Sequence, residues 1–581
     1  MACRAANSSI IELNISMIEQ CITKKNLSLG KLIHGRLLKS ALTLHTLLAN
    51  RLLDMYSKCG TFDHAQALFD EMPHRNHQSW NTLLGALSRA GHLHAARQLF
   101  DEMPERNLVS FNTMISSLAH SGHQKEALSL FRRLRRDSMV DEKMDRFTVV
   151  AVAMACAGLE DLHAVRQLHA AVVVSGLEMN LIMSNVMIDA YGKCGDAEAS
   201  SSLFDRMGPR DVVSWTSLIG AYARANQLDK ACQLFERMPV RNSVSWTALI
   251  SGHEQHGHEA VALELFQRMM EERVEPTPFT LVSLLSACAR LGLIGRGTEL
   301  HGYIVRRHPF NLFEHNALID MYAKCGNISL ATKVFAEMPE RDFISWNSMV
   351  TGFAQNGHGE QSLRVFRSMI DEGVKPNNVT FLAVLSACSH AGLVSEGRQV
   401  LRMMEEYNLV PKPEHYAAFI DALGRKRQLS EAMEFVERLH LGGGMDAIGV
   451  WGALLGACQV HGDLELAKKA AESLFVLDPE NGVRYITLSN IYSAAGRWDD
   501  ARRLRAVMKE KGLKKDPGCS WIEVRSIKHV FVAEDKSHFA VEEIYGMLSL
   551  LVDQMKQREE SDSFRHFVEY LVKFQVMNGP D

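Results

Sequence analysis

The sequence has no long hydrophobic run and no excess of positive charge. None of its 581 residues falls in an unbroken apolar stretch of the roughly 18 residues that a membrane-spanning helix needs, so we expect a soluble protein with no membrane partner. The formal net charge is -4. Nonspecific phosphate binding usually shows as a basic excess, and a case for nucleic acid therefore has to rest on local residues.

Motifs for catalysis and metal binding are also scarce. There is no Cys-x-x-Cys pair, no phosphate-binding glycine loop and no Gly-x-Ser-x-Gly nucleophile motif. His358-Gly-Glu360 has the His-x-Glu spacing of zinc deaminases, but it lies in a predicted turn without the cysteine pair that completes such a site. The cluster of His253, His256 and His258 lacks His-Glu-x-x-His spacing. We therefore predict no catalytic residue, no metal site and no cofactor, although a Ser/His/Asp site built from distant residues stays open.

Cysteine is present, but its pattern does not indicate disulfides. The chain has 11 cysteines, an odd number, and they recur at equivalent positions of two kinds: Cys59, Cys194 and Cys325, and Cys156, Cys288 and Cys388. Equivalent positions in successive repeats point in the same direction. We therefore expect small core residues and a reducing compartment.

What the chain does have is internal repetition. Met55-Tyr-Ser-Lys-Cys-Gly60 returns as Ala190-Tyr-Gly-Lys-Cys-Gly195 and as Met321-Tyr-Ala-Lys-Cys-Gly326. Apolar residues recur at helical spacing on both sides of a turn within each repeat, and Met-Pro closes many repeats because proline cannot continue a helix. Since 581 residues exceed what one core usually spans, the sequence predicts an all-α solenoid of helical hairpins.

The repeats differ in length. Intervals of 31, 34 and 35 residues coexist, which argues against the constant 34-residue period of tetratricopeptide repeats. The register predicts thirteen units over residues 11–447, after a short N-terminal segment, 1–10, that could be a targeting remnant. The units are 11–45, 46–76, 77–107, 108–145, 146–180, 181–211, 212–242, 243–277, 278–311, 312–342, 343–377, 378–412 and 413–447.

Four stretches carry a resemblance to a known family. They are DVVSWTSLIGAY from Asp211, NALIDMYAKCG from Asn316, FLAVLSACSHAGLV from Phe381 and EHYAAFIDALGR from Glu414. Together they resemble the short, long and terminal motifs of plant pentatricopeptide repeat proteins of the mixed-length (PLS) subclass. The resemblance covers nearly the whole chain. It implies a right-handed superhelical solenoid that binds single-stranded organellar RNA in a sequence-specific way.

The second position of the units is mostly apolar. A column of apolar side chains on one face could sandwich successive bases, or it could serve packing between repeats, and periodicity leaves both interpretations open. Gln78 interrupts the column. The residues are Leu47, Val109, Phe147, Ile182, Val213, Val244, Phe279, Phe313, Ile344 and Val379.

The fifth and last positions of many units are polar on a helix face that is otherwise apolar. Amides and hydroxyls both donate and accept, which reading a Watson–Crick edge requires, whereas helix capping is the ordinary explanation for the last position. The resemblance favours base reading. The predicted pairs are Asn50/Asn76, Asn81/Asn107, Asn112/Asp145, Asn185/Asp211, Thr216/Asn242, Thr247/Thr277, Asn316/Asp342 and Asn347/Asn377.

The resemblance also implies what each pair reads. Asn with Asp favours uridine, Asn with Asn a pyrimidine, and Thr with Asn adenosine, with N-terminal units toward the RNA 5′ end. Thr247/Thr277 is ambiguous, and units with an apolar fifth residue should discriminate poorly: Ile15, Val150, Val282 and Leu382. The expected footprint is 5′-YYUnUARnUYnn-3′, upstream of an edited cytidine.

The C-terminal part resembles the extensions of RNA-editing relatives. Residues 448–524, predicted as two further helical hairpins, resemble an E domain, and 525–557 resemble the E+ segment that precedes a DYW-type deaminase in longer relatives. No role is assigned to the tail, 558–581. The resemblance implies an editing specificity factor that recruits a DYW-type deaminase in trans and binds small organellar editing factors.

Two other functions stay open at this point. One is RNA stabilisation or splicing without editing, and the other is a protein scaffold like those built from tetratricopeptide repeats. The expected compartment is a plant organelle, with the mitochondrion favoured over the chloroplast by the habit of the family.

Overall fold

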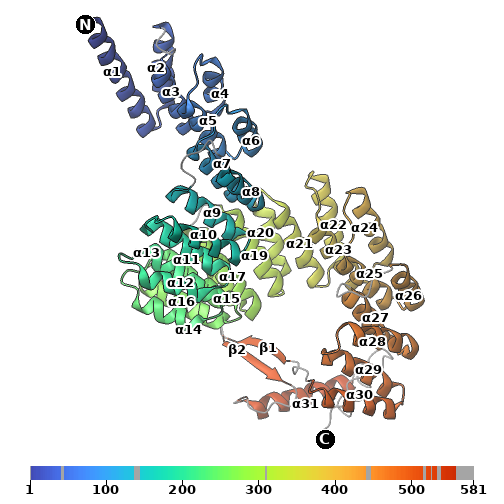
Figure 1. The fold of residues 1–581 in the computed structure, drawn as a ribbon. Coiled ribbons are helices and arrows are strands. Elements are labelled where there is room, and N and C mark those ends of the chain that lie inside the picture. The colour runs from blue at the N-terminus through green and yellow to red at the C-terminus, as the bar shows by residue number, and fades with distance from the viewer. Residues whose placement is uncertain are drawn as a thin grey trace. The chain divides into compact units, whose positions relative to one another are not determined.

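The structure, a computed structural model, describes residues 2–40, 45–136, 144–307, 310–439, 447–513, 519–524, 527–532, 538 and 540–557. These residues are almost entirely helical (Figure 1). The chain forms two compact units, residues 1–287 and 288–581, whose boundary falls within helix α17.

The first unit is a series of helical hairpins. Its helices are α1 (Ala2–Lys24), α2 (Leu27–Lys39), α3 (Thr46–Lys58), α4 (Phe62–Glu71), α5 (His77–Arg89), α6 (Leu93–Glu102), α7 (Leu108–His120), α8 (Gln124–Arg136), α9 (Arg146–Gly158), α10 (Leu162–Val174), α11 (Leu181–Lys193), α12 (Ala197–Arg206), α13 (Val212–Arg224), α14 (Leu228–Arg237), α15 (Ser243–Gln255), α16 (Glu259–Glu271) and α17 (Pro278–Leu291). From α3 onward, each odd-numbered helix begins at the first residue of a unit in the sequence register.

The second unit continues the pattern with α18 (Ile294–Arg307), α19 (Leu312–Lys324), α20 (Ile328–Glu337), α21 (Phe343–Gln355), α22 (Gly359–Asp371), α23 (Asn378–Ala391), α24 (Val394–Glu406), α25 (Pro413–Arg425), α26 (Leu429–Arg438), α27 (Ile448–His461), α28 (Leu464–Leu477), α29 (Gly482–Ala494) and α30 (Trp498–Glu510). It ends with strands β1 (Cys519–Val524) and β2 (Ile527–Val532) and helix α31 (Val541–Gln557).

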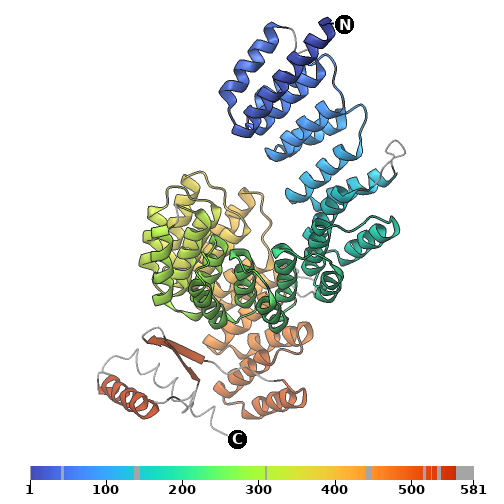
Figure 2. The same cartoon turned by 90° about the vertical axis from the view of Figure 1, so that its left-hand side faces the viewer.

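Within each unit the first helices of successive hairpins stack on one another. Helix α11 packs on α9 and α13, for example, and α25 packs on α23 and α27, while second helices such as α12 and α26 pack on the first helices of their own hairpins, α11 and α25. Figure 2 shows this side-by-side order of hairpins. A prediction of stacked helical hairpins is therefore confirmed in both units.

Each hairpin turns through a residue with positive φ. Gly195 has φ +81°, a conformation that costs glycine nothing, and Asn226 takes the same place in the next hairpin with φ 55°. Asparagine is the residue that best substitutes for glycine there. The Lys-Cys-Gly repeats of the sequence are thus the ends of first helices.

Aromatic pairs join one hairpin to the next. The phenylalanine near the end of a second helix meets the tryptophan of the following first helix edge to face, as Phe235 does with Trp246 at a centroid distance of 4.6 Å. Phe204 and Trp215 repeat this contact at 5.0 Å. Trp246 is fully buried, so these pairs form the core between hairpins.

The cysteines follow the expected core positions only in part. Cys156, Cys288 and Cys388 are buried, and burial raises the pKa of the Cys156 and Cys388 thiols to about 12. Cys59, Cys194 and Cys325 are half-buried because they lie at the C-terminal ends of first helices, next to the turn glycine.

Helices reach the N-terminal end of the described residues, and a short sheet lies near their C-terminal end. Helix α1 begins at Ala2, so residues 2–10, predicted as a short N-terminal segment that could be a targeting remnant, are helical, and they contain no proline or glycine that would end a helix. The C-terminal extension is not wholly helical, because β1 pairs antiparallel with β2 from Cys519 opposite Val532 to Val524 opposite Ile527. Helices α27 to α30 form the two expected hairpins, and the tail 558–581 lies outside the described residues. Among the described residues, no helix has the length and apolar character that crossing a membrane needs.

Candidate nucleic-acid interface

The structure brings the fifth and last residues of most predicted pairs into direct contact. The fifth residue lies in the second turn of a first helix, and the last residue immediately precedes the next first helix. Side-chain hydrogen bonds join Asn50 to Asn76 (3.0 Å), Asn81 to Asn107 (3.2 Å), Asn112 to Asp145 (2.9 Å), Asn185 to Asp211 (3.1 Å), Thr247 to Thr277 (3.2 Å) and Asn316 to Asp342 (3.2 Å).

The other two pairs are arranged differently. The Thr216 hydroxyl donates to the carbonyl of Val212 at 2.8 Å, inside its own helix. The Asn347 carbonyl oxygen accepts from the Thr380 hydroxyl at 2.6 Å, while Asn377 accepts from the Thr380 backbone N–H at 3.0 Å. Thr380 therefore links the two members of the Asn347/Asn377 pair.

The last residue also caps the next helix. The Asp211 carboxylate accepts the Ser214 backbone N–H at 2.8 Å, and the Asn242 side chain accepts the Ser245 N–H at 2.9 Å. Equivalent caps form at Asn76, Asn107, Asp145, Asp342 and Asn377. Capping is thus real at the last position, and it fixes the side chain that faces the fifth residue.

Arginines hold the loops that carry several of these last residues. In five units the residue just before the last position is an arginine. Its Nε donates to the backbone carbonyl of the phenylalanine six residues earlier, and its guanidinium lies over the ring of that phenylalanine. For Arg241 and Phe235 the bond is 3.3 Å and the ring centroid is 4.8 Å away. Arg75, Arg106, Arg210 and Arg341 repeat the arrangement.

An aspartate at the last position fixes the orientation of the neighbouring amide. A carboxylate only accepts hydrogen bonds, so Asn112, Asn185 and Asn316 must each turn their Nδ2 toward it. Their Oδ1 atoms are buried and receive no hydrogen bond from the described residues. Asn50 differs, because its Oδ1 accepts from the Ser79 hydroxyl at 2.6 Å.

The same contacts also lower the pKa of the aspartate in the Asn185/Asp211 pair. Burial alone would raise the pKa of Asp211, but hydrogen bonds from the Ser214 backbone N–H, the Ser214 hydroxyl and Asn185 outweigh it and hold the pKa below its ordinary value. Asp211 is therefore a carboxylate at neutral pH.

The second-position side chains are exposed rather than packed between repeats. Val213 is 55% exposed, Ile182 64% and Phe313 67%, and Leu47, Val109, Phe147, Val244, Phe279, Ile344 and Val379 are exposed too. Exposed apolar groups recurring on one helix face form a surface that contributes little to the core. Gln78, which interrupts the column, is also exposed.

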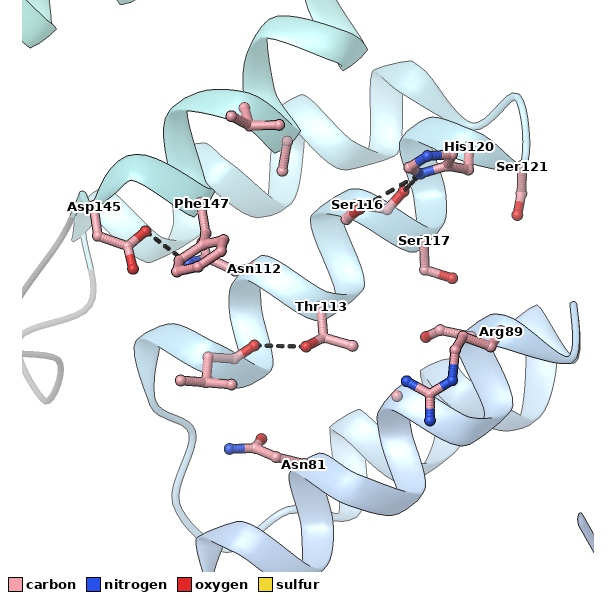
Figure 3. Close-up of a pocket in the computed structure, with 15 residues that line it drawn as sticks. Asn81, Arg89, Asn112, Thr113, Ser116, Ser117, His120, Ser121, Asp145 and Phe147 are labelled. Atoms are coloured by element: carbon pink, nitrogen blue, oxygen red, sulfur yellow. Dashed lines mark hydrogen bonds between the residues drawn. The ribbon is translucent and has the colours of Figure 1, made fainter. Parts of the chain in front are cut away.

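A groove of about 780 Å³ runs across α5, α7 and α9 beside these residues (Figure 3). Asn112, Asp145 and Phe147 lie at one end of the groove, and Arg89 and His120 lie at the other. A second groove, of about 320 Å³, lies along α13 and includes Val213, Thr216 and Asn242. Second, fifth and last positions of neighbouring units thus line common grooves.

The histidine cluster noted in the sequence is placed at a turn. His253 is buried in α15 with Nε2 3.3 Å from Cys232 Sγ, and burial lowers the pKa of its imidazole. His258 precedes α16, and the two rings lie 6.0 Å apart. His358 precedes α22 in the same way. The described residues contain no group of three or more side chains that could hold a metal ion.

Comparison with known proteins gives three kinds of match. A profile described as PPR repeat matches residues 49–77, 78–108, 109–139, 182–208, 213–243, 315–343, 379–409 and 414–443, one described as PPR repeat family matches 241–290 and 341–390, and one described as E motif matches 461–523.

Curated relatives match over most of the chain. One pentatricopeptide repeat-containing protein of Arabidopsis thaliana is 47% identical over 543 residues, 92% of this chain and 90% of the relative. Another from Arabidopsis thaliana is 38% identical over 555 residues, 94% of this chain and 74% of the relative. Some relatives are named as chloroplastic and others as mitochondrial.

Among solved structures, the pentatricopeptide repeat protein PPR10 in complex with an 18-nt psaJ RNA element is 18% identical. The match covers 81% of this chain and 80% of that one, with a TM-score of 0.48.

Proposed function

Because the chain belongs to the pentatricopeptide repeat family and carries an E motif, we propose that it binds single-stranded RNA in a sequence-specific way and directs C-to-U editing of plant organellar transcripts. The observation that carries the RNA proposal is the recurrence of hydrogen-bonded fifth and last residues beside exposed apolar side chains. This combination offers stacking surfaces together with polar groups that can pair with base edges.

The Asn/Asp pairs have the chemistry to select uridine. Uracil presents an N3–H donor between two carbonyl acceptors. In the Asn185/Asp211 pair the amide orientation is fixed, and the Oδ1 acceptor of Asn185 lies beside its second Nδ2 hydrogen. Together these two groups match the N3–H donor and one carbonyl acceptor of uracil.

An asparagine at the last position imposes no such orientation, because it can donate as well as accept. Asn/Asn pairs therefore suit either pyrimidine, and the footprint that follows from all eight pairs is 5′-YYUnUARnUYnn-3′. Asn185 and Asp211 define the position that is easiest to test. Changing them to Thr and Asn should shift the preferred base there from U to A.

The editing step would require a partner. The region from Trp451 onward, which includes the E motif, would dock a DYW-type deaminase supplied in trans. Small organellar editing factors would bind the units that have an apolar fifth residue. In this proposal the chain selects the site, and the partner supplies the zinc and the general acid. The relatives named as chloroplastic or mitochondrial support an organellar location, and we favour the mitochondrion.

Sequencing organellar transcripts in plants that lack the protein tests this proposal. We expect one or a few C-to-U sites to lose editing and to have the footprint immediately upstream. If every site stays edited, the editing proposal fails. RNA abundance and splicing in the same plants would then show whether the chain serves one of those processes.

A further inference from the structure

Basic side chains recur on the same face as the base-reading residues. Positions five, nine and thirteen of a first helix are spaced by four residues and therefore follow one line along the helix. Position thirteen is often lysine or arginine: Lys58, Arg89, Lys193, Arg224, Arg290, Lys324 and Arg425. Figure 3 shows this arrangement for α5, where Asn81 and Arg89 lie at different ends of one groove.

In several units an aspartate at position nine holds this cation. Asp54 pairs with Lys58 at 2.8 Å, and Asp320 pairs with Lys324 at 2.8 Å. Asp421 pairs with Arg425 at 2.9 Å.

Asp189 holds two cations. It contacts Lys193 of its own helix at 2.7 Å and Arg224 of the next first helix at 3.2 Å. It also lines the groove of Thr216 and Asn242 together with Arg224.

Units with glycine at position nine lack this carboxylate. A methyl group built on Gly85 would lie 3.3 Å from Nη1 of Arg89, and one built on Gly220 would lie 3.5 Å from Nη1 of Arg224. The guanidinium thus folds back over the space that the aspartate side chain fills elsewhere. Arg89 donates to the Ser57 hydroxyl at 3.0 Å. The position-nine residues that line its groove are Gly85 and Ser116, and neither carries a carboxylate.

We propose that Asp189 is an internal counter-ion that occupies the place of an RNA phosphate between Lys193 and Arg224 and thereby limits the affinity of this part of the surface for RNA. The inference rests on the proposed function. A phosphate has the same charge sign and the same oxygen acceptors as the carboxylate, so the two compete for the same N–H donors. Asp54, Asp320 and Asp421 act in the same way on single cations.

The proposal implies that the strength of phosphate binding differs from one unit to the next along the bound RNA strand. At Gly85 a phosphate meets Arg89, which forms no ion pair with a carboxylate among the described residues. Arg224 beside Gly220, in contrast, is still held by Asp189. Where position nine is aspartate, the phosphate must displace its carboxylate first. Since these ion pairs lie at the surface, with 35% of the Asp189 side chain exposed, they add little to folding stability, and removing the carboxylate should leave the fold intact.

The substitution Asp189→Asn tests the proposal, because asparagine keeps the shape and removes the charge. The matched control is Glu198→Gln. Glu198 of α12 pairs with Lys230 of α14 at 2.8 Å, outside both grooves, and its loss changes the net charge by the same amount. Wild type and both variants are titrated with an RNA of the predicted footprint between about 50 and 200 mM salt.

We expect Asp189→Asn to bind about three- to tenfold more tightly at low salt and to steepen the dependence of log K on log salt by about 0.7, the value for one added phosphate contact on a single strand. Glu198→Gln should change affinity less than about twofold, since it acts only through the long-range field. Adding Arg224→Gln and Lys193→Gln to Asp189→Asn should remove the gain.

Unchanged or weaker binding by Asp189→Asn, with wild-type melting behaviour, would overturn the proposal, and so would an equal gain in Glu198→Gln. If Asp189→Asn melts earlier than wild type, Asp320→Asn gives the same test in the other unit through the Lys324 pair. Failure of the proposed function has a different signature, because wild type itself would then bind the footprint RNA no better than a scrambled one.

Discussion

Asp211 gives the sharpest test of how one side chain can serve both the fold and the proposed reading of RNA. It caps α13 through the Ser214 N–H at 2.8 Å, and it accepts the Asn185 amide at 3.1 Å. Replacing it by alanine removes a cap worth about 1 kcal/mol. It also leaves the buried Asn185 amide without its partner, at about 1–3 kcal/mol. We therefore expect Asp211→Ala to lower the free energy of unfolding at pH 7 by about 2–4 kcal/mol.

Asp211→Asn should behave differently. Asn242 caps the next first helix with the same geometry, accepting the Ser245 N–H at 2.9 Å, so an asparagine at position 211 can keep the cap. It can also accept the Asn185 Nδ2 hydrogen. We expect Asp211→Asn to lower the free energy of unfolding at pH 7 by less than about 1 kcal/mol, which is the difference between a charge-assisted and a neutral hydrogen bond.

The two variants also differ from wild type in their response to acid. The pKa of Asp211 is lowered in the fold, so its carboxylate stabilises the protein above the ordinary aspartate pKa of about 4, and this contribution is lost as pH falls through the lower folded value. The stability gap between wild type and Asp211→Asn should therefore narrow below about pH 4.

Urea unfolding of the three proteins across pH, together with RNA titrations, measures these effects. In the titrations, Asp211→Asn should lose the preference for U over C at the base facing Asn185 while keeping overall affinity. Equal destabilisation by Asn and Ala would refute the shared capping geometry. A stability gap that does not change with pH would refute the role of the carboxylate.

The other predictions concern packing, loop anchoring and the exposed column. Gly252→Ala should destabilise by about 1–3 kcal/mol, because the new Cβ would lie 2.6 Å from Ala223 Cβ, whereas Gly220→Ala meets only a flexible arginine and should be neutral or stabilising in thermal melts. Arg241→Lys should lower the free energy of unfolding in urea by about 1 kcal/mol, because lysine cannot bond the Phe235 and Glu236 carbonyls together and stack on the Phe235 ring. An unchanged free energy of unfolding would contradict the anchoring role. Val213→Ser, at a site 55% exposed, should leave the melting temperature within about 2 °C of wild type but weaken RNA binding. A lower melting temperature with unchanged RNA affinity would mean that the apolar column packs in the core.

Much of the fold follows from local signals in the sequence. The starts of several first helices are marked by Asn or Asp followed three residues later by Ser or Thr, and the Asp211/Ser214 capping box is an example. Turn glycines and Met-Pro mark the other ends. The alternation of the two helices then follows because each hairpin has an apolar face that only a neighbouring hairpin can cover.

Other features depended on contacts that no local pattern encodes. The β-hairpin needs Cys519 and Val532 to pair across a turn, and neither six-residue strand encodes that pairing by itself. The apolar periodicity is weak before Ile10, so the pattern alone does not predict where α1 begins.

The candidate surface was predictable in its positions but not in its hydrogen bonds. Periodicity located Asn50 and Asn185 at equivalent places. It could not show that the Oδ1 of Asn50 accepts from Ser79, while that of Asn185 receives no hydrogen bond from the part of the chain that the structure describes. The bridging of Lys193 and Arg224 by Asp189 joins two neighbouring repeats, and reading one repeat at a time does not reveal it.

Selection of RNA from a random single-stranded library by the purified chain tests the central claim most directly. The account predicts enrichment of 5′-YYUnUARnUYnn-3′, with a change from U to A at one position when Asn185 and Asp211 become Thr and Asn. Enrichment of no common sequence, or the same sequence for both proteins, would contradict it.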